Sequence, residues 1–174
     1  MAGSMFYRFC LVCGGRLELR HDPDGHERPT CGNCGFVLYR NPKPSGNAVV
    51  VQDGRLLLVQ RAIEPHLGWW DIPGGFLEGR EHPKEGARRE VREETGLEVE
   101  ILGLVGIFMG SYPYGPEEDS TLNLYYEARP TGGMLRAGSD ASALAWFRPD
   151  ELPEQIAFRC CRDALEAWKA LNGH

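Results

Sequence analysis

Long apolar runs are missing from this sequence. Nowhere do about 18 apolar residues follow one another, as a membrane-spanning helix requires. The opening residues, MAGSMFYRF, also lack the apolar core of a secretory signal. Internal repeats and low-complexity segments are absent from the sequence as well. We therefore expect a cytoplasmic globular protein with no membrane partner.

Positive charge is in short supply. The 174 residues include 19 Lys and Arg against 25 Asp and Glu, a net charge of −6. Residues 1–44 carry six basic and four acidic residues. The excess of negative charge therefore lies in residues 45–174, which carry 13 basic and 21 acidic residues. An acidic main domain is repelled by phosphate backbones, which argues against nucleic acid as a partner. The excess of carboxylates favours a site that holds a cation.

Cysteine is scarce except near the N-terminus, where two CxxC pairs are separated by 17 residues: Cys10, Cys13, Cys31 and Cys34. A glycine follows each pair and allows the tight turn in which backbone amides face the thiolates. This pattern predicts a zinc ribbon with four cysteine ligands and a structural Zn²⁺. Two disulfides or a redox pair are the alternatives, and a cytosolic location disfavours disulfides.

The chain length suits a small module joined to one medium domain. Prolines in the segment Arg40–Ser45 favour extended backbone, so we expect a zinc ribbon over 1–40, a stiff linker over 41–45 and the main domain over 46–174. Two apolar runs flank the turn pair Asp53-Gly54, which predicts a hairpin over 47–60. Because both runs are nearly continuously apolar, helices are expected on each face of the sheet.

Further elements follow from capping residues and periodicity. Pro83 and Gly96 suit the first position and the left-handed cap of a helix over 83–95. His82 stands where a capping hydroxyl would be expected, which casts doubt on the N-cap. Strands are predicted over 98–109, 120–128 and 143–148, with a polar loop over 112–119. An amphipathic helix is predicted over 154–171, in which Cys160 and Cys161 pack as small apolar residues.

Three glutamates, Glu90, Glu93 and Glu94, share an arc of the helix predicted over 83–95. Such crowding of like charges costs little free energy on a solvated helix face. The three glutamates alone therefore do not distinguish a solvated face from a functional site, and the surrounding residues must be considered. The stretch from Gly75, GFLEGREHPKEGARREVREETGL, matches the pattern Gx5Ex7REUxEExGU, in which U is aliphatic. It matches at every fixed position: Gly75, Glu81, Arg89, Glu90, Val91, Glu93, Glu94, Gly96 and Leu97.

This stretch resembles the signature of the Nudix hydrolases, and the resemblance covers residues 46 to about 152. It implies an α/β fold, the Nudix α/β/α sandwich with a mixed sheet, and hydrolysis of a nucleoside diphosphate linked to another group with Mg²⁺ or Mn²⁺. Glu90 and Glu94 lie one helical turn apart and can reach one cation. The resemblance adds the carbonyl of Gly75 as a ligand. Glu93 extends the metal site sideways, and Arg89 steers Glu93.

Other residues have two interpretations each. Glu81 either supports the metal shell or forms a salt bridge to an arginine, and Arg61 either grips a phosphate or is exposed. Trp69 and Trp70 either stack on a base or plug the sheet. The remaining substrate-binding candidates are Phe76, Pro113 and Tyr114. The glutamates of the signature rank first as general base, with the alternatives Glu117, Glu118, Asp119 and Asp140.

A Nudix domain behind a four-cysteine ribbon resembles the NADH pyrophosphatases and a shorter group associated with ADP-ribose and FAD. The former carry SQPWPFPxS, whereas residues 111–116 read SYPYGP. Residues 150–158 resemble the tail of the shorter group, so we expect ADP-ribose or FAD as substrate and AMP as product. An NADH pyrophosphatase, or a nucleotide-sensing regulator with a partner-binding ribbon, is the alternative. The expected partner is a small nucleotide, and the sequence is compatible with a homodimer.

Overall fold

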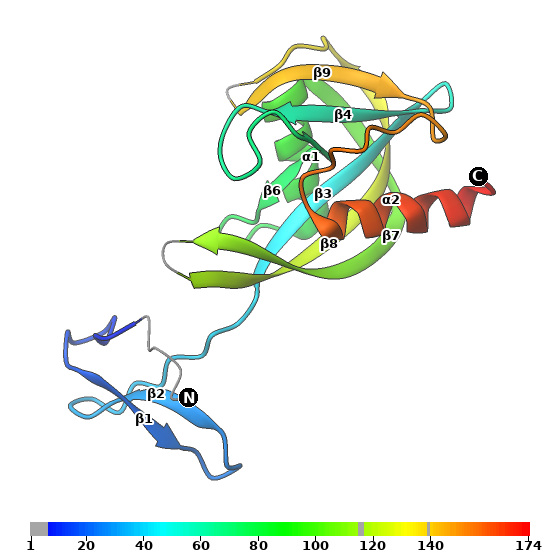
Figure 1. Ribbon diagram of the computed structural model, residues 1–174. Coiled ribbons are helices and arrows are strands. Elements are labelled where there is room, and N and C mark those ends of the chain that lie inside the picture. The colour runs from blue at the N-terminus through cyan, green and yellow to red at the C-terminus, as the bar shows by residue number, and fades with distance from the viewer. Residues whose placement is uncertain (1–6, 115–116, 139) are drawn as a thin grey trace. The chain divides into compact units, whose positions relative to one another are not determined.

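The computed structural model describes residues 7–114, 117–138 and 140–174. The chain forms two compact units, and the boundary between them falls after Asn41 (Figure 1). Strand β3 (Lys43–Gln52) begins within the segment 41–45 that was expected to be a linker. The proline-containing segment is extended, as expected, but most of it belongs to the sheet of the second unit.

The first unit is built on a hairpin of β1 (Leu17–His21) and β2 (Glu27–Cys31). The two strands are antiparallel, and Leu17 lies opposite Cys31. Gly14 and Gly35, which follow the two CxxC pairs, adopt φ values of +71° and +75°. Only glycine takes this conformation without strain, so the glycines shape the two turns that present the cysteines.

The second unit contains a mixed sheet, formed by β3, β4 (Arg55–Arg61), β5 (Trp70–Asp71), β6 (Gly74–Phe76), β7 (Leu97–Tyr114), β8 (Glu117–Gly133) and β9 (Ala141–Phe147). The main strand order is β5-β4-β3-β8-β7, with β6 paired to β3 and β9 to β4. Strand β3 runs parallel to β8 and antiparallel to β4 and β6. Asp53 and Gly54 have φ values of +51° and +71°, as the predicted hairpin turn between β3 and β4 requires.

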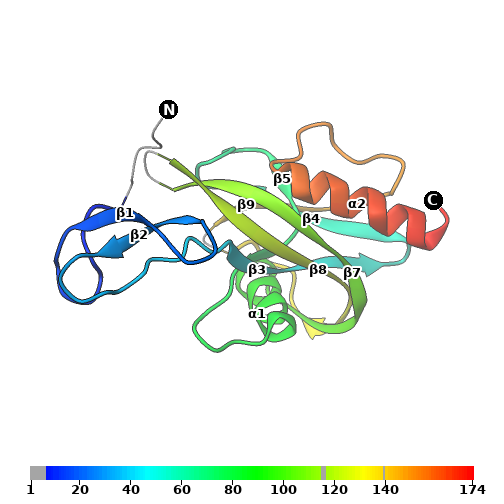
Figure 2. The ribbon, with the colours of Figure 1, turned by 90° about the horizontal axis from the view of Figure 1, so that it is seen from below.

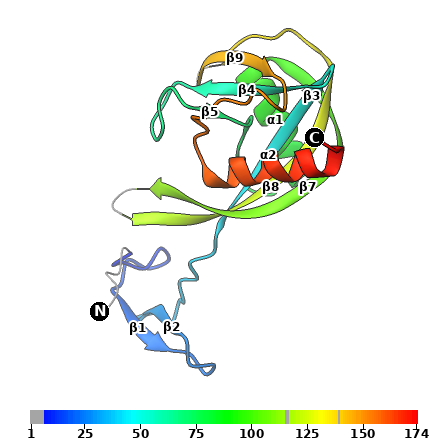
Figure 3. The same cartoon turned by 45° about the vertical axis from the view of Figure 1, so that its right-hand side comes forward.

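Strands β7 and β8 are longer than predicted and form a long ribbon (Figure 3). The polar loop expected over 112–119 is wrong for most of its length, because β7 continues to Tyr114 and β8 begins at Glu117. Pro113 lies within β7, and residues 115–116 fall outside the described part of the chain.

Helix α1 (Pro83–Thr95) packs on one face of the sheet. Gly96 takes the left-handed conformation that ends it, with φ +73°. Nδ1 of His82 accepts a hydrogen bond from the Lys84 amide at 3.2 Å, so the histidine caps the helix despite its lack of a hydroxyl. Ala87 and Val91 are fully buried against the sheet.

Helix α2 (Arg159–Asn172) covers the opposite face, so the sheet lies between two helical layers (Figure 2). The predicted start at residue 154 is wrong. The preceding segment pairs with strand β5: the Trp70 amide donates to the Gln155 carbonyl at 2.9 Å, and the Ala157 amide donates to the Trp70 carbonyl at 2.8 Å. These bonds hold the backbone extended until Phe158, the N-cap. No helix in the described ranges is long and apolar enough to cross a bilayer.

Candidate active site

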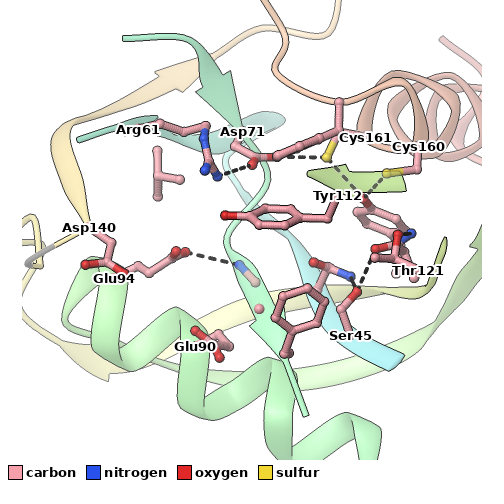
Figure 4. A pocket seen from close by; sticks show the side chains of 18 of the residues that line it. Ser45, Arg61, Asp71, Glu90, Glu94, Tyr112, Thr121, Asp140, Cys160 and Cys161 are labelled. Atoms are coloured by element: carbon pink, nitrogen blue, oxygen red, sulfur yellow. Dashed lines mark hydrogen bonds and ion pairs between the residues drawn. The ribbon is translucent and has the colours of Figure 1, made fainter. Parts of the chain in front are cut away.

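Of the three signature glutamates on α1, Glu90 and Glu94 line one cleft (Figure 4). The glycine pair of β6 lines the same cleft. Oε2 of Glu94 accepts a hydrogen bond from the Gly74 amide at 3.1 Å. A methyl group at Gly75 would lie 2.5 Å from the carboxylate of Glu90, so any larger residue there would displace that carboxylate. Glu93 is half exposed, with 53% of its side-chain surface accessible, and is not among the residues that line the cleft. The helix thus turns Glu90 and Glu94 toward one site and leaves Glu93 at its margin.

Arg89 connects the signature glutamates. Its Nε and Nη2 atoms donate to both oxygens of Glu81 at 2.9 and 3.0 Å. Its Nη1 donates to Glu90 at 2.7 Å and to Glu93 at 3.0 Å. The forked hydrogen bond to Arg89 lowers the pKa of Glu81. Of the two interpretations of Glu81, the structure shows the salt bridge, and Arg89 orients three carboxylates rather than Glu93 alone.

Burial disfavours the charged forms of both inward glutamates. It raises the pKa of Glu90, although the Arg89 guanidinium acts in the opposite direction. It also raises the pKa of Glu94 to about 8, opposed by the Gly74 amide and reinforced by the charges of Asp71 and Glu90. Two such carboxylates in one cleft are hard oxygen donors of the kind that fits Mg²⁺ or Mn²⁺. A cation bound there would neutralise diphosphate oxygens and acidify a water molecule.

A cleft of about 330 Å³ opens beside these glutamates. Arg61 lines it and has only 14% of its side chain exposed, so the interpretation of Arg61 as an exposed residue is wrong. Its Nε donates to the Pro65 carbonyl at 2.7 Å, and its Nη1 donates to the carboxylate of Asp71 at 3.2 Å. Its Nη2 is buried and has no hydrogen-bond partner among the described residues. A buried, unpaired guanidinium nitrogen in a cleft is suited to an anionic ligand.

Aromatic rings form one wall of the cleft. Phe76 meets Tyr112 edge-on at 5.6 Å between ring centroids, and Tyr112 lies 5.9 Å from Phe158. The predicted tryptophans lie elsewhere: the Trp70 ring packs on Phe147 in the core and the Trp69 ring packs on His66.

Neither tryptophan is among the residues that line the cleft, nor is Pro113, which is exposed. The alternative bases are also dispersed. Asp140 lines the cleft, whereas Asp119 pairs with Lys43 at 2.9 Å. The side chains of Tyr114, Glu117 and Glu118 lie outside the described part of the structure.

Several cleft residues escaped the sequence analysis. Asp71 is buried, and it accepts hydrogen bonds from the Ile72 amide and from the Cys161 thiol at 2.7 Å. Burial raises its pKa, and the Cys161 thiol and Arg61 lower it. Cys160 and Cys161 are buried as expected, but they also line the cleft and contact the hydroxyl of Tyr125.

Four neutral polar side chains also line the cleft: Ser45, Asn47, Thr121 and Asn123. They were missed as well, yet each strand carries its two polar residues at alternate positions beside apolar ones. Alternate residues of a strand face the same side of the sheet, so this spacing is a signal that the sequence did contain.

The four cysteines of the first unit form a second candidate metal centre. All four sulfur atoms lie within 4.8 Å of one another, with 3.7 Å between Cys10 and Cys34 and 3.5 Å between Cys13 and Cys31. These distances are far longer than a disulfide bond of about 2 Å. They match the separation of about 3.8 Å that tetrahedral Zn–S bonds of about 2.3 Å impose. The cluster therefore fits Zn²⁺.

Comparisons with known proteins agree with this geometry. The NUDIX domain family matches residues 42–163, and the family described as Nudix N-terminal matches residues 8–40. A NUDIX hydrolase structure from Nitrosomonas europaea has 30% identity and a TM-score of 0.82, covering 97% of this chain and 94% of that one.

Curated relatives match as well. A MutT-like protein of Streptomyces ambofaciens is 39% identical over 63% of this chain and 65% of its own length. An ADP-ribose pyrophosphatase of Methanocaldococcus jannaschii is 32% identical over 71% of each chain. The NAD-capped RNA hydrolase NudC of Vibrio atlanticus is 31% identical over 84% of this chain, which spans 51% of that protein's length.

The class of protein is thus an α/β fold with a mixed sheet between two helical layers, in which carboxylates of one helix line a cleft together with a glycine pair. The chain belongs to the Nudix hydrolase family. Its first unit adds the zinc ribbon of the Nudix N-terminal family.

Proposed function

We propose that this protein hydrolyses the diphosphate of a nucleoside diphosphate linked to a second group, using Mg²⁺ or Mn²⁺. The observation that carries the proposal is the convergence of two kinds of site in one cleft. Glu90 and Glu94 supply anionic oxygens for a cation, and Arg61 supplies an unpaired cationic nitrogen. A diphosphate bound to a cation has both complementary charges, so it can contact the carboxylate-bound metal and the arginine together.

Each residue has a distinct role in this proposal. Glu90, Glu94 and the Gly75 carbonyl hold the cation, while Arg61 donates to a phosphate oxygen. Asp71 is a positioning residue, because its carboxylate holds the Arg61 guanidinium at 3.2 Å. The aromatic wall offers flat surfaces to a base, each contact contributing about 1 kcal/mol. The water that attacks phosphorus loses its proton to a glutamate of the signature or to Asp140, which lines the same cleft.

The proposed substrates are ADP-ribose and FAD, with AMP as a shared product. The relative from Methanocaldococcus jannaschii, named an ADP-ribose pyrophosphatase, supports this choice because it matches over 71% of its length. An NADH pyrophosphatase is the second candidate, since the NudC protein matches over 84% of this chain. The stretch SYPYGP departs from the motif of the NADH enzymes and favours the first candidate.

A panel of nucleotides incubated with Mg²⁺ and with Mn²⁺, followed by product separation, tests the proposal. We expect AMP from ADP-ribose, and AMP with FMN from FAD, at higher kcat/KM than for NADH. The Glu94→Gln variant should bind these nucleotides but lose most turnover. A preference of about tenfold or more for a nucleoside triphosphate would overturn the substrate choice. Nucleotide binding without any turnover would instead support a sensing regulator.

A further inference from the structure

Four neutral polar side chains form what we call the polar floor of the cleft: Ser45 and Asn47 of β3 with Thr121 and Asn123 of β8. Figure 4 labels Ser45 and Thr121 among them. Each is only 4–7% exposed. The two strands are parallel neighbours, and the register places Ser45 beside Asn123. The residues therefore face the cleft from one side of the sheet, where an apolar core would otherwise be expected.

The polar floor lies next to the candidate metal site. In the antiparallel pairing of β3 with β6, Asn47 is opposite Gly74 and Ser45 is opposite Phe76. The Asn47 amide oxygen packs so closely against Gly74 that a methyl group there would collide with it. The polar floor therefore begins directly beside the glycine pair at which the cation is proposed to bind.

Almost every polar hydrogen of the polar floor is donated to an acceptor within the protein. The Asn47 amide nitrogen donates to Ser45 Oγ at 2.9 Å and to a β8 carbonyl at 3.3 Å. The Asn123 amide nitrogen donates to Thr121 Oγ1 at 2.9 Å and to a β7 carbonyl at 3.1 Å. The Ser45 hydroxyl donates to Asn123 Oδ1 at 2.8 Å. Only the Thr121 hydroxyl keeps a hydrogen without an acceptor among the described side chains and carbonyls.

The polar floor therefore offers a ligand mainly hydrogen-bond acceptors. Asn47 Oδ1 accepts no hydrogen bond among the described residues, and the oxygens of Ser45 and Asn123 each keep a free lone pair. A surface of neutral acceptors pairs with groups that donate, and hydroxyl groups are such donors. Phosphate oxygens are acceptors only, so a further phosphate at this place would face unpaired lone pairs.

We propose that the polar floor binds the hydroxyl groups of a polyol attached to the second phosphate of the substrate. This inference rests on the proposed function and deepens it: the second group begins with a sugar or a sugar alcohol. Both the terminal ribose of ADP-ribose and the ribityl chain of FAD satisfy this requirement. The γ-phosphate of a nucleoside triphosphate does not, which makes the floor a specificity determinant against triphosphates.

The test compares two substrates in three proteins. ADP-ribose carries the polyol, and the β-methyl ester of ADP keeps adenosine and the diphosphate but replaces the polyol by a methyl group. The Ser45→Ala variant removes the hydroxyl at the centre of the floor. Ser142→Ala is the matched control, because that serine is exposed on β9 and does not line the cleft. Thermal unfolding of each variant confirms that it is folded.

In wild-type protein we expect a higher kcat/KM for ADP-ribose than for the methyl ester. Ser45→Ala should lower kcat/KM for ADP-ribose by about tenfold, the effect of one lost hydrogen bond with its unpaired partners, and change that of the ester by less than about twofold. Ser142→Ala should change neither. If Ser45→Ala does not fold, Thr121→Val replaces it, since that change preserves shape and removes a hydroxyl.

An equal loss on both substrates, or no loss on either, would overturn the assignment of the floor to the polyol. Failure of the wild-type protein to hydrolyse either compound with Mg²⁺ would contradict the proposed function instead. In that case the same comparison of Kd values, measured by calorimetry with Mg²⁺, still decides whether the floor recognises the polyol.

Discussion

Replacing Glu94 by glutamine should stabilise the second unit in the absence of divalent cations, while it removes most activity. Burial raises the pKa of Glu94 from 4.5 to about 8 in the folded protein. Between these values an unfolded chain ionises the glutamate, whereas the folded protein keeps it protonated. The contribution of Glu94 to the stability of the wild-type protein is therefore fully present below the unfolded pKa of 4.5. The wild-type protein loses this contribution as the pH rises toward the folded pKa of about 8.

The size of the effect follows from the same shift. At about 1.4 kcal/mol for each pKa unit, the upper limit is about 5 kcal/mol. Because Glu94 lines an open cleft that water enters, we expect only about 1–3 kcal/mol near pH 8. Glutamine keeps the acceptor for the Gly74 amide at 3.1 Å and has no charge to bury. The gain in stability should be near zero around pH 4.5 and should grow as the pH rises.

Urea unfolding monitored by tryptophan fluorescence measures this effect without interference from the zinc ribbon. All four tryptophans, Trp69, Trp70, Trp146 and Trp168, belong to the second unit. Added Mg²⁺ should stabilise the wild-type protein more than the variant, because a ligand that binds only the folded state raises its stability.

Glu93→Gln is the control for this measurement, since Glu93 is adjacent but half exposed. It should leave the slope of stability against pH unchanged. A Glu94→Gln variant with the wild-type slope, or a Glu93→Gln variant with an equal change, would refute the assignment of the slope to a buried Glu94 carboxylate.

Three further predictions concern the glycine pair, the arginine and the ribbon. Gly75→Ala should lower kcat by about 100-fold with the fold retained, because the methyl group would lie 2.5 Å from the Glu90 carboxylate and displace it; steady-state kinetics that match wild type would contradict this. Arg89→Lys should destabilise the second unit by about 1–3 kcal/mol in urea unfolding, since one ammonium group cannot replace the forked bonds to Glu81 and the bonds to two other carboxylates. Metal analysis should find one zinc for each chain, and removal of zinc should unfold the first unit without changing the tryptophan signal; a zinc-free preparation with a folded ribbon would disprove the zinc assignment.

Features encoded within a few neighbouring residues were predictable from the sequence. The hairpin turn at Asp53-Gly54, the bounds of helix α1 and the clustering of the four cysteines were all predicted correctly. The family followed from the spacing of the glutamates and glycines. In each case local backbone geometry or a short ligand spacing determines the structure, so no distant contact is needed.

Only the tertiary structure decided which side chains share the cleft. Ser45 and Asn123 are 78 residues apart and meet because β3 pairs in parallel with β8, an arrangement that no local pattern specifies. Tertiary packing also brings Arg61 into the cleft beside Asp71, and it packs Trp70 against the core. The sequence alone determined that a carboxylate site on a Nudix-like scaffold exists, because its spacing is local. The neutral, acceptor-rich surface beside that site depends on long-range strand pairing, and so only the fold could reveal it.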